Sequence, residues 1–291
     1  MWPEALIRDI AAQRAVLFFG AGISMNSIGV DGVTRPKSWI SFLNEATKSS
    51  VAIFPSLKKD IKALMAKNDL LTACEVIRRA IGRDDFVELV KKEFQIPGYK
   101  PAPIHDLLWK LDIRIAITPN FDNIYDALVA ARGNGTVTVK RYFDSDVADS
   151  IRRKERVVIK AHGSVTDPDH LIFTRADYAK ARSQYSRFYE LLDALLRTHT
   201  FLFVGCGLDD PDIRLLLEDY CYRHPYSPQH YFVIPSKTLS APVKGVVEES
   251  LRVKLLEYKA TPDHANLTIE LGKLVSAVEN ARIEMGKQLS W

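Results

Sequence analysis

The sequence predicts an α/β fold of the Rossmann-like type, in which a parallel sheet is covered by helices on both faces. Three observations support this fold class: short, continuously apolar runs recur along the chain, stretches of helical periodicity separate them, and several runs end directly in glycine-rich or polar loops. Continuous apolarity is typical of strands that are buried on both faces. The predicted strands are residues 15–19, 115–118, 157–160, 201–204 and 231–234.

Composition narrows the class of protein. Of the 291 residues, 47% are hydrophobic and 26% are charged, which is typical of a folded globular chain, and we expect a single domain over residues 1–291. The net charge of +4 does not favour sequence-specific binding of nucleic acid. The N-terminus lacks the pattern of a signal peptide, and the apolar runs are too short to span a membrane.

The cysteines argue against a structural metal. Cys74, Cys206 and Cys221 are an odd number at wide spacings, without the paired spacing of a zinc site or a disulfide framework. We therefore expect no metal and a reducing, cytoplasmic location.

Two segments depart from the alternation of strand and helix. Apolar residues recur at helical spacing over residues 39–110, between Pro36 and the prolines at 101 and 103, which predicts a helical insertion. Residues 260–291 predict a C-terminal helix. Its apolar stripe is Leu267, Ile269, Leu271, Leu274, Val275, Val278, Ile283 and Met285.

A glycine loop follows the first predicted strand. Its residues are Gly20, Ala21, Gly22, Ile23 and Ser24. Glycines at such a point let the backbone approach a ligand closely and leave N–H groups for an anion such as a diphosphate. Methionine stands where the third glycine of the dinucleotide-binding pattern would fall, so a structural turn from strand to helix is an equal alternative.

Polar residues follow the next two predicted strands. Thr118, Asn120 and Asp122 stand where a strand should end and a helix should begin near Phe121, so they either bind a ligand or cap that helix. His162 precedes a glycine at the end of another strand, where it is placed for proton transfer or is a core histidine with a satisfied hydrogen bond.

A second glycine loop follows the strand at 201–204. Gly205 and Gly207 flank Cys206, and the acids at 209, 210 and 212 surround Pro211, which suits the first turn of a helix. Helix capping explains these acids better than a metal, and Cys206 is predicted to be a small buried residue and not a nucleophile. Because ligands bind beyond the carboxyl ends of parallel strands, the four loops together predict one crevice.

These motifs resemble the sirtuin-like domains, in particular the zinc-free bacterial branch of NAD-degrading effectors of antiphage defence. The glycine loop, the Thr118-Pro119-Asn120-Phe121-Asp122 segment and the His162-Gly163 pair occur in that family's order. The resemblance implies catalytic roles for Asn120, Asp122 and His162. It also implies that NAD, as the substrate, is bound by Gly20, Ala21, Gly22, Ile23, Ser24, Thr118, Gly205 and Gly207.

The sequence differs from the deacylase sirtuins in two respects. It lacks four zinc cysteines, and it lacks the Pro-Asp-Phe-Arg segment that those enzymes carry after the glycine loop. The resemblance therefore implies an NAD glycohydrolase that yields nicotinamide and ADP-ribose or its cyclic form. A catalytically silent NAD-binding or ADP-ribose-binding subunit is the first alternative, and a protein deacylase is the second.

The resemblance also implies regulation. We expect self-association and control by a partner such as a hexameric ATPase, an argonaute-type protein or a nucleotide-binding sensor, since 291 residues leave little length for a sensor domain. The helical segment 39–110 is expected to cover the nicotinamide end of the crevice as a lid or an assembly surface. The alternative is a satellite core that only covers one end of the sheet.

Overall fold

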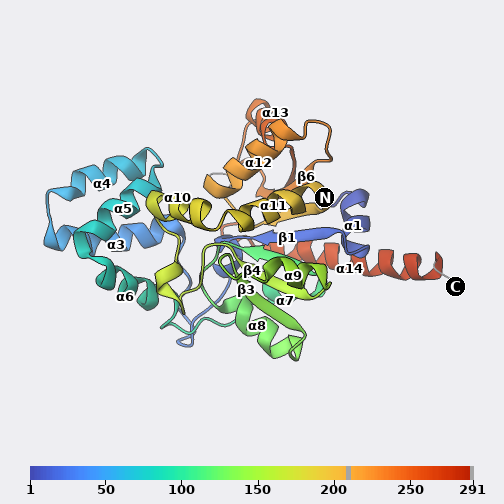
Figure 1. Cartoon of the computed structure of the whole chain (residues 1–291), viewed down its shortest axis with the longest axis horizontal. Helices are drawn as coiled ribbons and strands as arrows, with labels where there is room; N and C mark the ends of the chain where they lie inside the picture. The colour runs from blue at the N-terminus through green and yellow to red at the C-terminus, as the bar shows by residue number, and fades with distance from the viewer. Residues whose placement is uncertain (208–210, 289–291) are drawn as a thin grey trace.

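The protein is a parallel α/β structure. The computed structural model describes residues 1–207 and 211–288, and within these ranges the strands form one seven-stranded sheet in the order β3-β4-β2-β1-β5-β6-β7, with parallel pairing throughout (Figure 1). The predicted fold class is confirmed. The strands are β1 (Ala15–Phe19), β2 (Ile115–Thr118), β3 (Val137–Arg141), β4 (Arg156–Lys160), β5 (Thr200–Val204), β6 (His230–Pro235) and β7 (Val253–Tyr258).

The two strands that the sequence pattern did not predict, β3 and β7, are the edges of the sheet. The side chains of β3 are half-buried or exposed, and those of β7 mix buried with exposed positions. An edge strand has a neighbour on one side only and needs no continuous apolar run, so the criterion that identified the central strands could not detect these two.

Alternate residues of each central strand feed two separate cores. Leu17 and Phe19 of β1 point to the face covered by α1 (Glu4–Ala11), α7 (Pro103–Lys110), α8 (Ile124–Gly133) and α14 (Ala265–Gln288). Val16 and Phe18 point to the other face, which is covered by α9 (Val147–Arg152), α10 (Arg175–Gln184), α11 (Ser186–Thr198) and α12 (Pro211–Arg223), with α13 (Ala241–Ser250) beside β7. This two-sided burial explains why the central strands are apolar at every position.

A group of helices stands at one end of the sheet and has its own core. These helices are α3 (Trp39–Ile53), α4 (Leu57–Ala66), α5 (Leu70–Ile81) and α6 (Arg83–Phe94), and we call them the helical lobe (Figure 1). Side chains from outside the lobe, Val165, Leu171 and Phe173, complete its core. Helix α7, the last of the helical segment 39–110, packs on the main core instead, through Ile104 and Leu108.

The C-terminal helix α14 lies along the main core and begins at Ala265. Leu271, Leu274 and Val278 are fully buried, as the apolar stripe predicted. Ile269 and Ile283 are an exception, because they are 55% and 57% exposed and do not belong to the buried face. Among the described helices, none is both long and apolar enough to cross a membrane.

Candidate functional site

The four predicted loops follow adjacent strands. The order β4-β2-β1-β5 brings their carboxyl ends to one edge of the sheet. Thr118 of β2 pairs in register with Lys160 of β4, so Asn120 and His162 each lie two residues beyond a matched pair. On the other side of β1, Phe19 pairs with Val204, which places the two glycine loops next to each other.

The Ser24 hydroxyl links the Asp122 carboxylate to the Asn120 amide. Its Oγ donates to Asp122 Oδ2 at 2.7 Å and accepts from Asn120 Nδ2 at 3.0 Å. All three side chains are buried, and Asn120 and Asp122 are both 7% exposed. Buried polar groups that bond to one another hold a fixed geometry, so this network fixes the glycine loop relative to the loop after β2.

Thr118 and Asp122 also have structural roles. Thr118 Oγ1 donates to the Phe19 carbonyl at 2.8 Å and accepts from the Asn120 amide at 3.1 Å. Helix α8 begins at Ile124 and not near Phe121 as the pattern predicted, and the Ile124 amide donates to Asp122 Oδ1 at 3.1 Å. Neither Thr118 nor Asn120 caps α8; Asp122 accepts from its first amide, while the other carboxylate oxygen of Asp122 accepts from Ser24.

The two glycine loops are in direct contact. A Cβ at Gly20 would lie 2.7 Å from the Gly205 carbonyl oxygen, and one at Gly22 would lie 2.9 Å from the same atom. The Gly20 amide donates to Val204 O at 3.0 Å, and the Gly22 amide donates to Gly205 O at 2.9 Å. These glycines are thus required by the approach of two backbones, and their amides bond within the protein.

The other residues of the predicted NAD-binding set differ in exposure. Ala21 and Gly207 are exposed, whereas Ile23 is fully buried and its amide donates to the Gly20 carbonyl at 3.0 Å. Residues 208–210 of the second glycine loop, which include Asp209 and Asp210, lie outside the described residues.

His162 is held between a ring and a tight turn. It is 7% exposed, and its ring lies edge-on to the Tyr178 ring with centroids 5.1 Å apart. The following Gly163 has φ +83°, and a Cβ there would lie 2.5 Å from the His170 carbonyl oxygen. A side chain at 163 would therefore be strained twice over, by backbone conformation and by contact.

Hydrogen bonds join the loop after β2 to the loop after β4. The Ala161 amide donates to Thr118 O and the Val165 amide donates to Phe121 O, both at 2.8 Å. In addition, Ser164 Oγ donates to Asn123 Oδ1 at 2.9 Å. The loops that carry Asn120, Asp122 and His162 are consequently one structural unit.

A buried lysine lies beneath that unit. Lys160 is 1% exposed, and its Nζ donates to the Asp122 carbonyl and pairs with Asp126 Oδ1 at 3.4 Å. Burial raises the pKa of Asp126, and the Lys160 ammonium opposes that rise. A buried ammonium requires such partners, so Lys160 fixes the backbone that carries Asp122.

Sequence reasoning assigned no role to Lys160, Tyr178 or His105. A lysine at the end of an apolar strand was the available signal for the first of these. His105 is 1% exposed, and among the described atoms its Nε2 finds no hydrogen-bond partner. Burial lowers the pKa of His105, and the nearby Asp122 carboxylate acts in the opposite direction. The segment Thr174-Arg175-Ala176-Asp177-Tyr178 resembles one that recurs in the zinc-free sirtuin-like branch, but it carried no assigned chemistry, and no local pattern pointed to His105.

Other candidate features do not contribute to the site. Cys206 Sγ is partly buried and lies 3.5 Å from Val204 O and 3.7 Å from Phe18 O, as suits a packing residue. Over the described residues, no group of three or more His, Cys, Asp or Glu side chains is arranged to hold a metal ion.

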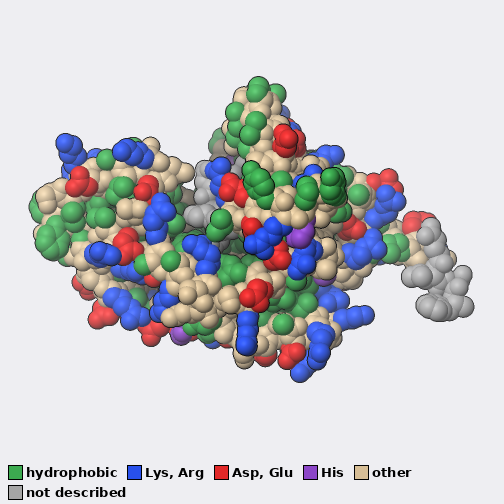
Figure 2. Space-filling view, turned by 45° about the horizontal axis from the view of Figure 1, so that its top comes forward, with side chains coloured by type: hydrophobic (Ala, Val, Ile, Leu, Met, Phe, Trp, Pro, Cys, Tyr) green, Lys and Arg blue, Asp and Glu red, His purple; other side chains and the backbone are tan. Residues whose placement is uncertain are grey.

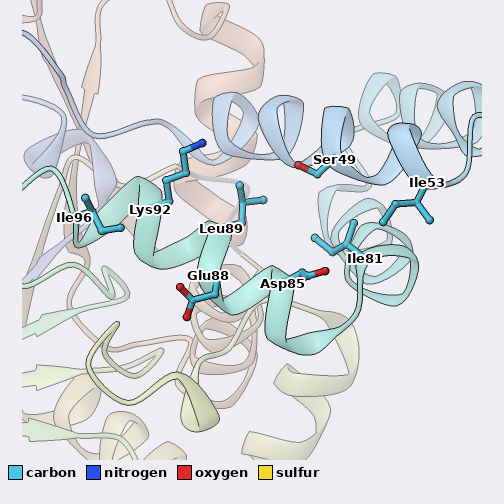
Figure 3. Close-up of a pocket in the computed structure, with 8 residues that line it drawn as sticks. All are labelled: Ser49, Ile53, Ile81, Asp85, Glu88, Leu89, Lys92 and Ile96. Atoms are coloured by element: carbon cyan, nitrogen blue, oxygen red, sulfur yellow. The ribbon is translucent and has the colours of Figure 1, made fainter.

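A surface groove lies on the helical lobe and extends to Ile96, just after α6 (Figure 3). Ile53, Ile81, Leu89 and Ile96 line it, and Asp85 and Glu88 of α6 are also at its margin. Figure 2 shows a notch in the upper outline between the lobe and the rest of the molecule, and below this notch the surface is continuous.

Residues 114–257, which include the loops after β2, β4 and β5, match the SIR2-like domain family. The chain is similar to the NAD(+) hydrolase ThsA of Enterococcus faecium, with 27% identity over 213 residues, 72% of this chain and 40% of that protein. It is also similar to defense-associated sirtuin 2 of Bacillus subtilis, with 26% identity over 208 residues, 70% of this chain and 19% of that protein. The NAD(+) hydrolase ThsA of Acinetobacter baumannii is 22% identical over 215 residues, 74% of this chain and 40% of that protein. The chain thus spans less than half the length of these relatives.

Proposed function

We propose that the protein is an NAD glycohydrolase that cleaves NAD to nicotinamide and ADP-ribose or its cyclic form, since residues 114–257 match the SIR2-like domain family. The observation that supports this most directly is the buried Ser24, Asn120 and Asp122 network, which adjoins His162 at the carboxyl ends of adjacent strands. Relatives named as NAD(+) hydrolases support the same activity.

In the proposed reaction, the bond between nicotinamide nitrogen and ribose carbon breaks, and its electron pair leaves with nicotinamide. Positive charge develops on the ribose ring, as in glycoside hydrolysis, and water adds to the ribose carbon. His162 accepts the proton that the water loses, or the proton of a ribose hydroxyl, as general base. Asn120 orients the ribose or the water.

Asp122 is proposed to accept hydrogen bonds from the nicotinamide carboxamide. Its carboxylate already accepts from Ser24 and from the Ile124 amide, but a carboxylate offers about four lone-pair sites and so retains capacity for a ligand. Ser24 and Lys160 keep this loop in place during the reaction.

We assign the diphosphate to the first glycine loop, residues 20–24, with Thr118 beside it, and the adenosine half to Gly205 and Gly207. Because the Gly20 amide donates to the Val204 carbonyl at the end of β5 and the Gly22 amide donates to the Gly205 carbonyl, these two glycines contribute close backbone approach and not free donors. In this proposal, groups of residues 20–24 other than the Gly20 and Gly22 amides contact the diphosphate.

The test is nicotinamide release from NAD by the purified protein, alone and with candidate partners. His162→Ala should lower the rate by at least about 10²-fold, because a positioned general base contributes about that much, and Asn120→Ala should lower it similarly because the ribose or the water loses its orientation. His199→Ala is the matched control, since His199 follows α11 at the opposite end of β5. Circular dichroism should be the same for all variants.

Two results would contradict this proposal. Cleavage by His162→Ala at the parental rate would remove His162 from catalysis. Tight NAD binding without release of nicotinamide under any condition would instead favour a silent binding subunit.

We further propose that the activity serves antiphage defence and is controlled by a partner protein such as a hexameric ATPase or a sensor. The similarity to a protein named defense-associated sirtuin 2 supports this role. Infected cells that express the parental protein with its partner should lose NAD, and cells that express His162→Ala should not. Light scattering of the purified protein tests the expected self-association.

A further inference from the structure

Helix α5 of the helical lobe forms hydrogen bonds with the first turn of α10. Arg78, in the last turn of α5, donates from Nη1 to both carboxylate oxygens of Asp177, at 3.0 and 2.8 Å, and from Nη2 to Thr174 Oγ1 at 3.0 Å. The Arg78 and Asp177 side chains are only 26% and 19% exposed. Because the two terminal nitrogens of the planar guanidinium bond to two different side chains, Asp177 and Thr174, this contact fixes an orientation and not only a distance.

The first turn of α10 is itself held by hydrogen bonds. Thr174 and Asp177 form a capping box, in which the Asp177 amide donates to Thr174 Oγ1 and the Thr174 amide donates to Asp177 Oδ2. The Phe173 amide also donates to Asp177 Oδ2, at 3.1 Å. Arg78 therefore bonds to the two side chains that determine where α10 begins.

The next residue after this box is Tyr178, whose ring lies edge-on to His162. Tyr178 is 6% exposed and Ala181, one turn later, is 2% exposed, so α10 has little freedom to move without moving Tyr178. The backbone leading into α10 is tied to the same histidine, because the Ile172 amide donates to the His162 carbonyl at 3.1 Å.

Two neighbouring ion pairs are more exposed, one from Arg175 at the start of α10 and one to Asp169 in the short 3-10 helix Pro168–His170. Arg175 pairs with Asp69 at 2.8 Å and Arg83 pairs with Asp169 at 2.6 Å, and these arginine side chains are 64% and 63% exposed. Exposed pairs contribute little in water, whereas partly buried, charge-assisted hydrogen bonds contribute more. Arg78 is accordingly less exposed than the arginines of these two neighbouring pairs.

We propose that Arg78 is a positioning residue for His162, acting from the helical lobe through Asp177, Thr174 and Tyr178. The inference rests on the proposed function in one respect, since it assigns His162 the base role. A displacement of the lobe relative to the sheet is thereby transmitted to the orientation of the His162 ring, without any contact between the lobe and NAD.

The kinetic test compares Arg78→Met with Arg79→Met. Arg79 is the neighbouring arginine, its side chain is 78% exposed, and it pairs only within α5, with Glu75, among the ion pairs of the described residues. Arg78→Met should lower kcat for nicotinamide release by about tenfold or more, with KM for NAD changed by less than about threefold, because the base is misplaced and the binding loops are not. Arg79→Met should keep both parental values.

A conservative variant and a double variant separate positioning from general damage. Arg78→Lys keeps the positive charge but loses the two terminal nitrogens of the guanidinium. Its kcat should therefore lie between those of the parent and Arg78→Met. Tyr178→Leu should lower kcat similarly, and Arg78→Met combined with Tyr178→Leu should lose much less than the product of the two single effects, since both act on one residue. Multiplicative losses would overturn the proposed route.

A measurement that needs no turnover separates failure of this inference from failure of the proposed function. The imidazole resonances of His162, identified by their loss in His162→Ala, report the Tyr178 ring that faces them. Arg78→Met should shift these resonances, and Arg79→Met should not. Unchanged resonances in a folded Arg78→Met protein would overturn the inference. A shift in a protein that never cleaves NAD would support the positioning and overturn the NADase proposal.

Discussion

Gly163→Ala is the substitution whose effect follows most directly from the geometry of the site. A Cβ at this position meets the His170 carbonyl oxygen at 2.5 Å, and φ is +83°. The positive φ should cost about 1–2 kcal/mol of unfolding free energy for an alanine. The contact should add about 1–3 kcal/mol, since the obstacle is backbone and cannot rotate away.

The matched control is Gly135→Ala. Gly135 has nearly the same φ, +77°, but an added Cβ would meet no atom within 4 Å among the described residues. It should therefore show only the backbone cost of about 1–2 kcal/mol. Urea unfolding followed by circular dichroism measures both values, and the difference isolates the contact with His170.

The same pair of variants tests function. Relief of the Gly163→Ala contact requires the segment after His162 to move, so nicotinamide release should fall by about 10²-fold, as is typical of misplacement by about 1 Å. Gly135→Ala should cleave NAD at the parental rate. Equal destabilisation of the two variants, together with parental turnover of Gly163→Ala, would refute the reasoning.

Three further predictions concern the network, the pH dependence of stability and metals. Ser24→Ala removes the hydroxyl that joins Asn120 to Asp122, and it should lower the unfolding free energy by about 1–3 kcal/mol and reduce nicotinamide release, as measured by urea unfolding and by the NAD assay. Burial lowers the pKa of His230 from 6.5 to about 4. As the pH falls through that window the unfolded chain binds a proton that the folded protein does not, so the unfolding free energy should fall by about 3 kcal/mol. His230→Asn, which keeps an acceptor for the Phe201 amide, should lose that pH dependence, and an unchanged dependence would show that another group causes it. Treatment with a chelator should leave the melting temperature and activity unchanged, and stoichiometric zinc by elemental analysis would favour the deacylase alternative.

The central part of the fold could be predicted because burial on both faces leaves a direct trace in the sequence. Phe201, Phe203 and Val204 are all buried, and the apolar run to which they belong predicts a strand without any knowledge of the neighbouring strands. In contrast, β3 is a strand because it lies beside β4, and its own residues are half exposed. Strands of that kind depend on a neighbour that local pattern does not identify.

The candidate site shows the same division. Ser24 and Asp122 are 98 positions apart, yet their meeting could be expected because both follow strands of one parallel sheet. Arg78 and Asp177 are 99 positions apart and meet only because the helical lobe docks in one particular way. Periodicity predicts that a helix has an apolar face, but it does not specify which polar residues the docked helix will bring to its neighbour.

Aromatic packing bears on whether the helical lobe only covers one end of the sheet. Phe121 stands between Asn120 and Asp122 in the chain, and its ring packs against Phe94 of the lobe at 4.7 Å and against Phe173 at 4.8 Å, between centroids. A satellite core would be independent of the catalytic loops, whereas this one includes the side chain between two of the proposed site residues. Because packed interiors transmit displacement, a movement of α6 would reach the Asn120 loop through Phe121. Through Arg78 the same lobe is joined to His162, so both halves of the proposed catalytic set share one mechanical support.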